Sequence, residues 1–115
     1  MRKVIAVDFD GTLCTRNWPG IGDSNDELIA QLIDEQKNGT AVILFSCRGG
    51  KRLKEAVQWC KKRGLIFDAV NKNLQERIRA YKADPRKISA DVYVDDRAAA
   101  FSFGKKLELG GMTDG

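Results

Sequence analysis

The chain has 115 residues, with 20 Lys and Arg against 16 Asp and Glu, no His, and 43% hydrophobic residues. This length fits one domain with its own core, which we expect to span residues 1–109, followed by a flexible C-terminal tail over 110–115. Without His, the protein cannot use a Ser-His-Asp or Cys-His relay or His-ligated zinc, so carboxylates, Lys, Arg, hydroxyls and backbone amides must carry any catalysis.

The first half of the chain predicts a strand, a loop and a helix. The apolar run over residues 4–7 is typical of a strand buried on both faces, and residues 11–23 are rich in turn formers. Ser24 and Glu27 have the spacing of a capping box that opens a helix, which we expect to end at Gly39. The apolar residues of this helix recur at helical spacing: Leu28, Ile29, Leu32 and Ile33.

The second half predicts the same alternation. Residues 41–45 form a second apolar strand, and a helix follows Gly49 and Gly50 and ends at Gly64. A shorter strand is expected over 65–70, a third helix from Asn73 to the Asp84-Pro85 break, and a last strand over 92–94. Strands that alternate with helices in this way predict an α/β fold with a parallel sheet.

The cysteines and the N-terminus indicate a protein of the cytoplasm. Cys14, Cys47 and Cys60 are odd in number and far apart, which argues against a disulfide framework and fits a reducing compartment. The apolar run near the N-terminus is too short for a signal peptide or a membrane span. We therefore expect no association with a membrane.

Polar side chains follow three of the predicted strands. Asp8 and Asp10 follow the first, Ser46 the second, and Asp95 and Asp96 the last. Because the carboxyl ends of parallel strands meet at one edge of the sheet, we expect these groups to converge there. Four carboxylates at close range repel one another unless a cation lies between them, and an oxygen-only ligand set favours Mg²⁺.

These residues resemble the haloacid dehalogenase superfamily of phosphohydrolases. The segment Asp8-Phe9-Asp10-Gly11-Thr12, directly after a strand, resembles that family's DxDGT signature. A hydroxyl residue, a Lys and an acidic pair follow in the family's order, and the likeness spans residues 4 to 97. It implies a three-layer Rossmann-like fold, with a mostly parallel sheet and helices on both faces.

The resemblance also implies residue roles. Asp8 would be the nucleophile that forms an aspartyl-phosphate, and Asp10 the general acid and base. Mg²⁺ would be held by Asp8, by Asp10 through its main-chain carbonyl, and by Asp95 or Asp96, with the choice between these two left open.

The resemblance implies that Ser46 and Lys87 contact the phosphate and take part in catalysis. Lys51 is the alternative to Lys87, and Arg48 is a further candidate for the phosphate contact. Gly11 fits a sharp backbone turn beside the phosphate, Thr12 belongs to the same motif, and the amides of Gly49 and Gly50 could meet an anion.

The spacing between the motifs leaves no room for a cap domain. Only a loop separates the first motif from its helix, and two helices and a strand already occupy the interval from Ser46 to Lys87. An open site suits a large phosphorylated substrate or closure by a second copy of the chain. The substrate candidates are a sugar phosphate, a nucleotide and the phosphorylated end of a nucleic acid.

Two other functions remain open. Residues 46–90 carry 13 basic and 4 acidic residues, and the charge is densest at Lys51, Arg52, Lys54, Lys61, Lys62 and Arg63. Such a block is typical either of a nucleic-acid-binding module or of a solvated helix face. The acids, the hydroxyl and the Lys also fit a phospho-acceptor receiver domain, although there the acidic pair follows the first strand.

Overall fold

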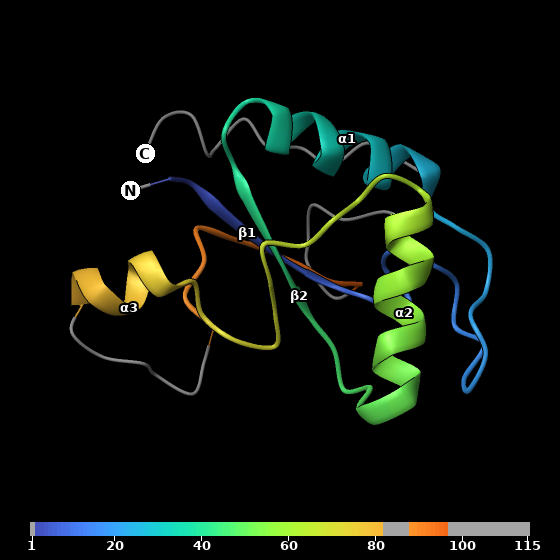
Figure 1. Cartoon of the computed structure of the whole chain (residues 1–115). Coiled ribbons are helices and arrows are strands. Elements are labelled where there is room, and N and C mark those ends of the chain that lie inside the picture. The colour runs from blue at the N-terminus through green and yellow to red at the C-terminus, as the bar shows by residue number, and fades with distance from the viewer. Residues whose placement is uncertain (1, 82–87, 97–115) are drawn as a thin grey trace.

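A computed structural model describes residues 2–81 and 88–96 of the chain (Figure 1). The elements follow one another as β1 (Val4–Asp8), α1 (Asp26–Lys37), β2 (Ala41–Phe45), α2 (Gly50–Lys62), β3 (Ala69–Val70), α3 (Gln75–Tyr81) and β4 (Val92–Val94). This order confirms the alternation of strands and helices predicted from the sequence.

The four strands form one parallel sheet in the order β3-β2-β1-β4. Val7 of β1 lies opposite Leu44 of β2 and Val94 of β4, so these three strands end side by side. The chain moves outward from β1 to β3 and then returns to place β4 on the other side of β1. The carboxyl ends of β1 and β4 therefore flank a topological switch point, where open α/β sheets bind their ligands.

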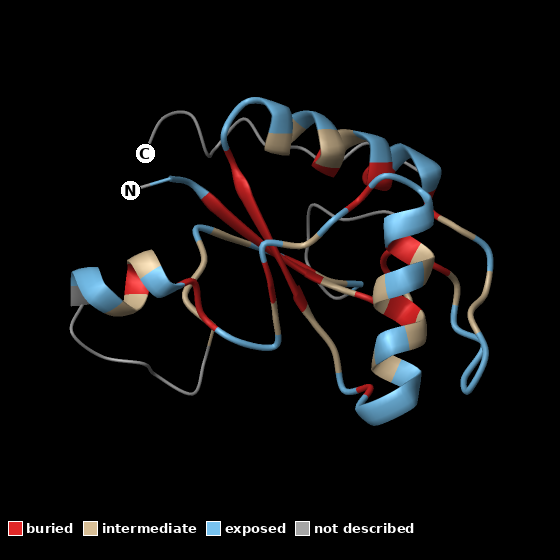
Figure 2. Ribbon diagram, in the orientation of Figure 1, coloured by how far each residue is buried: buried red, intermediate tan, exposed pale blue. Residues whose placement is uncertain are grey.

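Alternate residues of the strands pack into two separate cores. One core combines β1 and β2 with the apolar faces of both long helices, through Ile5, Val7, Val42, Leu44, Leu28, Leu32, Ala56 and Cys60. The other lies on the opposite face of the sheet and includes Val4, Ala41, Ile43 and Leu74. Figure 2 shows β1 and β2 buried along most of their length, whereas the edge strand β4 is partly exposed at Tyr93. The α/β class and the parallel sheet are confirmed.

The start of α1 differs from the prediction. Asn25, not Ser24, is the N-cap residue, and its side chain accepts a hydrogen bond from the amide of Leu28. The Ser24 hydroxyl instead donates to the Asp26 carboxylate over 2.6 Å. Asn25 is buried and also donates to the carbonyl of Thr12, so a contact with the preceding loop selects the cap.

The third strand is shorter than residues 65–70. Asp68 sits just before β3, where its amide donates to the carbonyl of Val42 and its carboxylate accepts from the amide of Val42. That side-chain contact occupies the Val42 amide, and the strand pairing of β3 begins only at Ala69.

Some expectations fall outside the described residues. These are Lys87, the end of the 1–109 domain and the tail over 110–115. Within the described ranges, no helix combines the length and the apolar character needed to cross a membrane.

Candidate functional site

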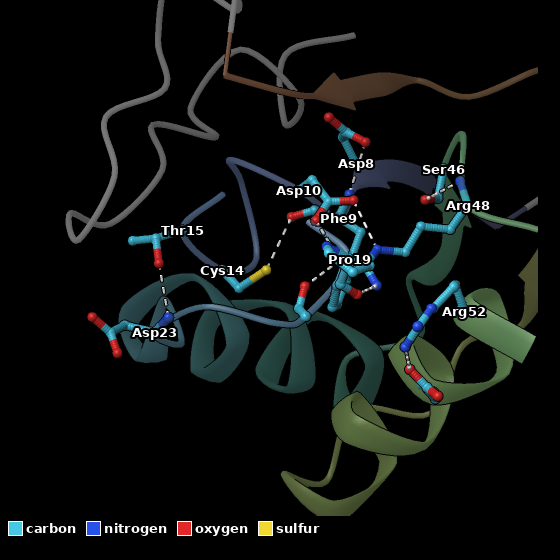
Figure 3. Close-up of polar contacts among 12 residues, drawn as sticks. Asp8, Phe9, Asp10, Cys14, Thr15, Pro19, Asp23, Ser46, Arg48 and Arg52 are labelled. Carbon is cyan, nitrogen blue, oxygen red and sulfur yellow. Dashed lines mark hydrogen bonds and ion pairs between the residues drawn. The ribbon is translucent and has the colours of Figure 1, made fainter. Parts of the chain in front are cut away.

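The acidic groups from the two ends of the chain meet at the switch point. Asp8 is the last residue of β1, and Asp95 and Asp96 follow β4, which pairs with β1. Figure 3 shows the Asp8 carboxylate on the side of the sheet edge where β4 runs. The convergence of Asp8 with Asp95 and Asp96, predicted from the strand ends, is therefore present.

Gly11 leaves room for the Asp96 carboxylate to lie against the loop after β1. Its φ of +84° lies in the left-handed region that favours glycine. A Cβ atom at this position would stand 2.7 Å from Asp96 Oδ2, closer than side chains normally approach. Arg16, from the same loop, forms an ion pair with this Asp96 oxygen. The absence of a side chain at Gly11 is thus what lets Asp96 lie so close to β1.

Asp8 sits in an electrostatically unfavourable place for a carboxylate. Burial raises the pKa of the Asp8 carboxyl, and the negative charges of Asp96 and Asp10 raise it further. The amide of Phe9 donates to Asp8 Oδ1 over 2.8 Å, which opposes this rise, as does the charge of Arg16. The site therefore holds negative charge that its own side chains only partly balance.

Asp10 is held by a paired set of bonds from Arg48. Arg48 Nε donates to Asp10 Oδ2 over 2.9 Å and Nη2 donates to Oδ1 over 2.8 Å (Figure 3). This fork-to-fork geometry fixes both the position and the plane of the carboxylate. The pairing also raises the pKa of Arg48, so the guanidinium stays charged.

Arg48 itself is enclosed by the loop that follows the first motif. Its side chain is only 1% exposed, and it donates to the carbonyls of Pro19 and Gly20. The rings of Phe9 and Trp18 lie 5.1 and 5.0 Å from its central carbon. We expected Arg48 to contact phosphate, but this arrangement leaves it almost no exposed surface, and its visible role is to position Asp10.

Ser46 stands at the end of β2, as predicted, and is fixed by a residue that the sequence analysis missed. The Ser46 hydroxyl accepts from the amide of Arg48 over 3.0 Å. The side chain of Asn71 accepts from the Ser46 amide and donates to the Ser46 carbonyl. Asn71 directly follows β3 and has a φ of +52°. A polar residue after the third strand is the signal that could have identified it.

Two other predicted phosphate ligands, Thr12 and Lys51, differ in their exposure to solvent. Thr12 is fully buried, and its hydroxyl has no hydrogen-bond partner among the described residues. Its side chain therefore faces the protein interior. Lys51 lies exposed in the first turn of α2, directly after Gly49 and Gly50, which open that helix.

The donor set at this edge can be tested against Mg²⁺. Mg²⁺ is usually bound by one or two carboxylates, with water and substrate phosphate completing its shell. Between residues 2–81 and 88–96, no three His, Cys, Asp or Glu side chains gather into a metal site by themselves. The Asp10 carboxylate is already paired with Arg48, and the ligand that the resemblance implies for this residue is its main-chain carbonyl. The carboxylates of Asp8 and Asp96 and a main-chain carbonyl are oxygen donors of the type that Mg²⁺ prefers, and the negative charge at Asp8 is only partly balanced by its neighbours.

A solved structure resembles this chain over most of its length. No protein-family model and no curated protein matches the chain. A solved structure of a conserved protein from Bacteroides thetaiotaomicron is 38% identical, with a TM-score of 0.75, over 86% of this chain and 79% of the other. The chain belongs to the same family as this protein. Since the relative is described only as a conserved protein, membership of this family brings a shared fold and no activity.

Proposed function

We propose that the protein is a Mg²⁺-dependent phosphate monoester hydrolase that works through an aspartyl-phosphate on Asp8. The proposal includes a three-layer fold of the haloacid dehalogenase type without a cap domain, so that the active site is open to substrate. It also places the protein in the cytoplasm. The observation that carries it is the meeting of Asp8 with Asp96 at the switch point, beside an Asp10 that is fixed in position by Arg48.

The first half of the reaction would use both aspartates of the first motif. Asp8 Oδ1 accepts from the Phe9 amide, which leaves Oδ2 to attack phosphorus. As the new oxygen–phosphorus bond forms, the bond to the leaving-group oxygen breaks, and Asp10 gives that oxygen a proton. A carboxylate offers about four lone-pair sites, so Asp10 can hold this proton while its two bonds to Arg48 remain.

The second half would release phosphate. Asp10 would take a proton from a water molecule, which attacks the aspartyl-phosphate and restores the Asp8 carboxylate. Asp8, the carbonyl of Asp10 and Asp96 or Asp95 would hold Mg²⁺, which, when bound, balances the negative charge that gathers on the phosphoryl oxygens. The Ser46 hydroxyl, which accepts from the amide of Arg48, would donate to a phosphoryl oxygen, and Asn71 holds the Ser46 backbone through its amide and carbonyl.

The test is hydrolysis of a broad panel of phosphate esters by the purified protein, with and without Mg²⁺. We expect activity that requires the metal and falls by several orders of magnitude in Asp8→Asn, since an amide is a poor nucleophile. Turnover in water labelled with heavy oxygen should place the label in the released phosphate and leave the Asp8 side chain unlabelled, because the water attacks phosphorus. Asp23→Asn, which alters an exposed aspartate outside the site, is the matched control. No hydrolysis across the panel would refute the proposal.

A nucleic-acid-binding module is the second candidate. It is favoured by α2, on which Lys51, Lys54, Lys61 and Lys62 are all exposed. Salt-sensitive binding to DNA or RNA that survives in Asp8→Asn would support it. A long-lived phosphorylated protein without turnover would instead favour a receiver-like signalling domain.

A further inference from the structure

Arg16 is an exposed cation that the loop after β1 holds beside the site. The loop is fixed next to it, because the Thr15 amide donates to the carbonyl of Asp23 over 2.9 Å and the Thr15 hydroxyl accepts from the Asp23 amide over 2.8 Å. The Arg16 side chain itself is 64% exposed and pairs with Asp96. Its backbone is therefore anchored, while part of its guanidinium remains accessible to a ligand.

The Arg16 guanidinium lies against Gly11, among the acidic groups of the site. Its Nη2 atom donates to Asp96 Oδ2, and its Nε and Cζ atoms lie 3.0 and 3.1 Å from the place where a Cβ of Gly11 would stand. The negative charges of Asp8 and Asp10 act on Arg16 as well. In return, the charge of Arg16 opposes the rise in the pKa of Asp8. Arg16 therefore offsets the negative charge of Asp8 and Asp96 together.

The Asp96 carboxylate has two cationic partners to choose from, Arg16 and the Mg²⁺ of the proposed function, on which this inference rests. The ion pair with Arg16 is exposed, and exposed pairs are weak enough to be replaced. Mg²⁺ binds through one or two carboxylates and substrate phosphate. If Asp96 is one of its ligands, a phosphoryl oxygen on the same ion arrives beside the carboxylate that Arg16 contacts.

We propose that Arg16 is a phosphate-binding residue, which exchanges its pairing with Asp96 for one with the phosphoryl group of the substrate when Asp96 binds Mg²⁺. A guanidinium suits this role because its planar fork matches two oxygens of a phosphate. The exchange keeps every charge paired, since Asp96 gains the metal ion and Arg16 gains the phosphate. Because the Arg16 side chain is exposed, it can turn without a change in the core.

Binding of Mg²⁺ and of inorganic phosphate, each measured by isothermal titration calorimetry, tests the exchange. Arg16→Met removes the guanidinium from the exposed loop. It should bind Mg²⁺ alone about two- to fivefold more tightly than the wild type, since an exposed ion pair no longer competes for Asp96. In saturating Mg²⁺ it should bind inorganic phosphate at least about tenfold more weakly, the size of one hydrogen bond between charged groups. The two affinities thus move in opposite directions.

Two further variants accompany this measurement. Arg16→Lys keeps the charge but loses the fork, and its affinity for phosphate should lie between those of Arg16→Met and the wild type. Arg52→Met removes another exposed arginine that pairs with an acid, and it should change neither affinity. With phenyl phosphate as substrate, KM should rise in Arg16→Met and stay normal in Arg52→Met.

The outcomes separate this inference from the proposed function. An unchanged or weaker affinity for Mg²⁺ in Arg16→Met would show that Arg16 holds Asp96 in place for the metal, and it would overturn the exchange. Phosphate binding that is absent from the wild type, or unchanged in Arg16→Met, would overturn the phosphate contact even where phosphatase activity stands. Phosphate binding that depends on Arg16, in a protein that hydrolyses no ester, would support the phosphate contact and refute the proposed function.

Discussion

Asp10 and Arg48 stand 38 positions apart and form a two-bonded ion pair, 2.9 and 2.8 Å long, at the end of the first two strands. The Arg48 side chain is 1% exposed and that of Asp10 is 22% exposed, so solvent reaches the pair only at the Asp10 carboxylate. It connects the first motif to the loop after β2 and to the carbonyls of Pro19 and Gly20.

Replacing Arg48 should damage both stability and activity. We expect Arg48→Met to lower the free energy of unfolding by about 3 kcal/mol, because it leaves the Asp10 charge and two carbonyls without their partner. In a phosphatase assay it should lower kcat more than it raises KM, since Asp10 acts on the leaving group. Arg48→Lys keeps the charge but loses the fork, and should fall between Arg48→Met and the wild type.

Arg52 provides the matched control for Arg48. It lies in the first turn of α2 and pairs with Glu55 over 3.2 Å, with both side chains well exposed. Arg52→Met should cost less than about 1 kcal/mol, the usual range for a surface pair. Equal losses for Arg48→Met and Arg52→Met in urea unfolding would contradict the importance that we give to the buried pair.

Gly11 and Gly39 form a second matched pair of sites. Both have a positive φ, +84° and +96°, but a Cβ at Gly11 meets Asp96 while a Cβ at Gly39 meets nothing within 4 Å. Each Ala substitution should cost about 1–2 kcal/mol in unfolding free energy from the left-handed backbone alone. Gly11→Ala should in addition displace the Asp96 carboxylate and weaken the stabilisation by Mg²⁺ in thermal unfolding. If both variants respond equally to Mg²⁺, the position of Asp96 does not govern metal binding.

The stability conferred by Asp8 should depend on pH. Its pKa is raised above the ordinary 3.8, so the folded protein binds this proton more tightly than the unfolded chain does. Protonated Asp8 stabilises the fold fully below that ordinary value, and this contribution is lost as the pH rises through the raised pKa. Asp8→Asn stays neutral, and we therefore expect it to be more stable than the wild type at neutral pH and about equal in acid. Each unit of raised pKa corresponds to about 1.4 kcal/mol.

Urea unfolding of wild type and Asp8→Asn, from about pH 3.5 to pH 7, measures this difference. Mg²⁺ provides a further check at neutral pH, because it should stabilise the wild type by binding the ionised Asp8 and should stabilise Asp8→Asn much less. A constant difference across the pH range would show that burial of the Asp8 charge is not its cause.

Asn71 allows hydrogen bonding and backbone strain to be separated. Asn71→Gly accepts the φ of +52° but loses both bonds to Ser46, and should cost about 1 kcal/mol in unfolding free energy. Asn71→Ala loses the same bonds and adds the strain, so it should cost about 1–2 kcal/mol more than Gly. Both variants should raise KM for phosphate esters through a misplaced Ser46. A normal KM in Asn71→Gly would show that Asn71 does not position Ser46 for substrate binding.

Local patterns in the sequence predicted the elements well where a single segment decides the outcome. The strand over 41–45 matches β2, and the strand over 92–94 matches β4, because each is a short apolar run bounded by polar residues. The capping box at Ser24 was wrong because a competing contact, from Asn25 to Thr12, comes from outside the helix. Such a contact leaves no trace in the spacing of Ser24 and Glu27.

The site shows the same division. The sequence alone predicts that Asp8, Ser46 and Asp96 lie at the ends of strands. Parallel strands must bring these ends to one edge of a sheet. Three contacts were decided only by the tertiary structure. Arg48 pairs with Asp10, Asn71 bonds the Ser46 backbone, and the Asp96 carboxylate approaches Gly11 closely. The physical reason is that strand order and loop packing depend on how the whole core closes, and these set which side chains from distant segments come within bonding distance.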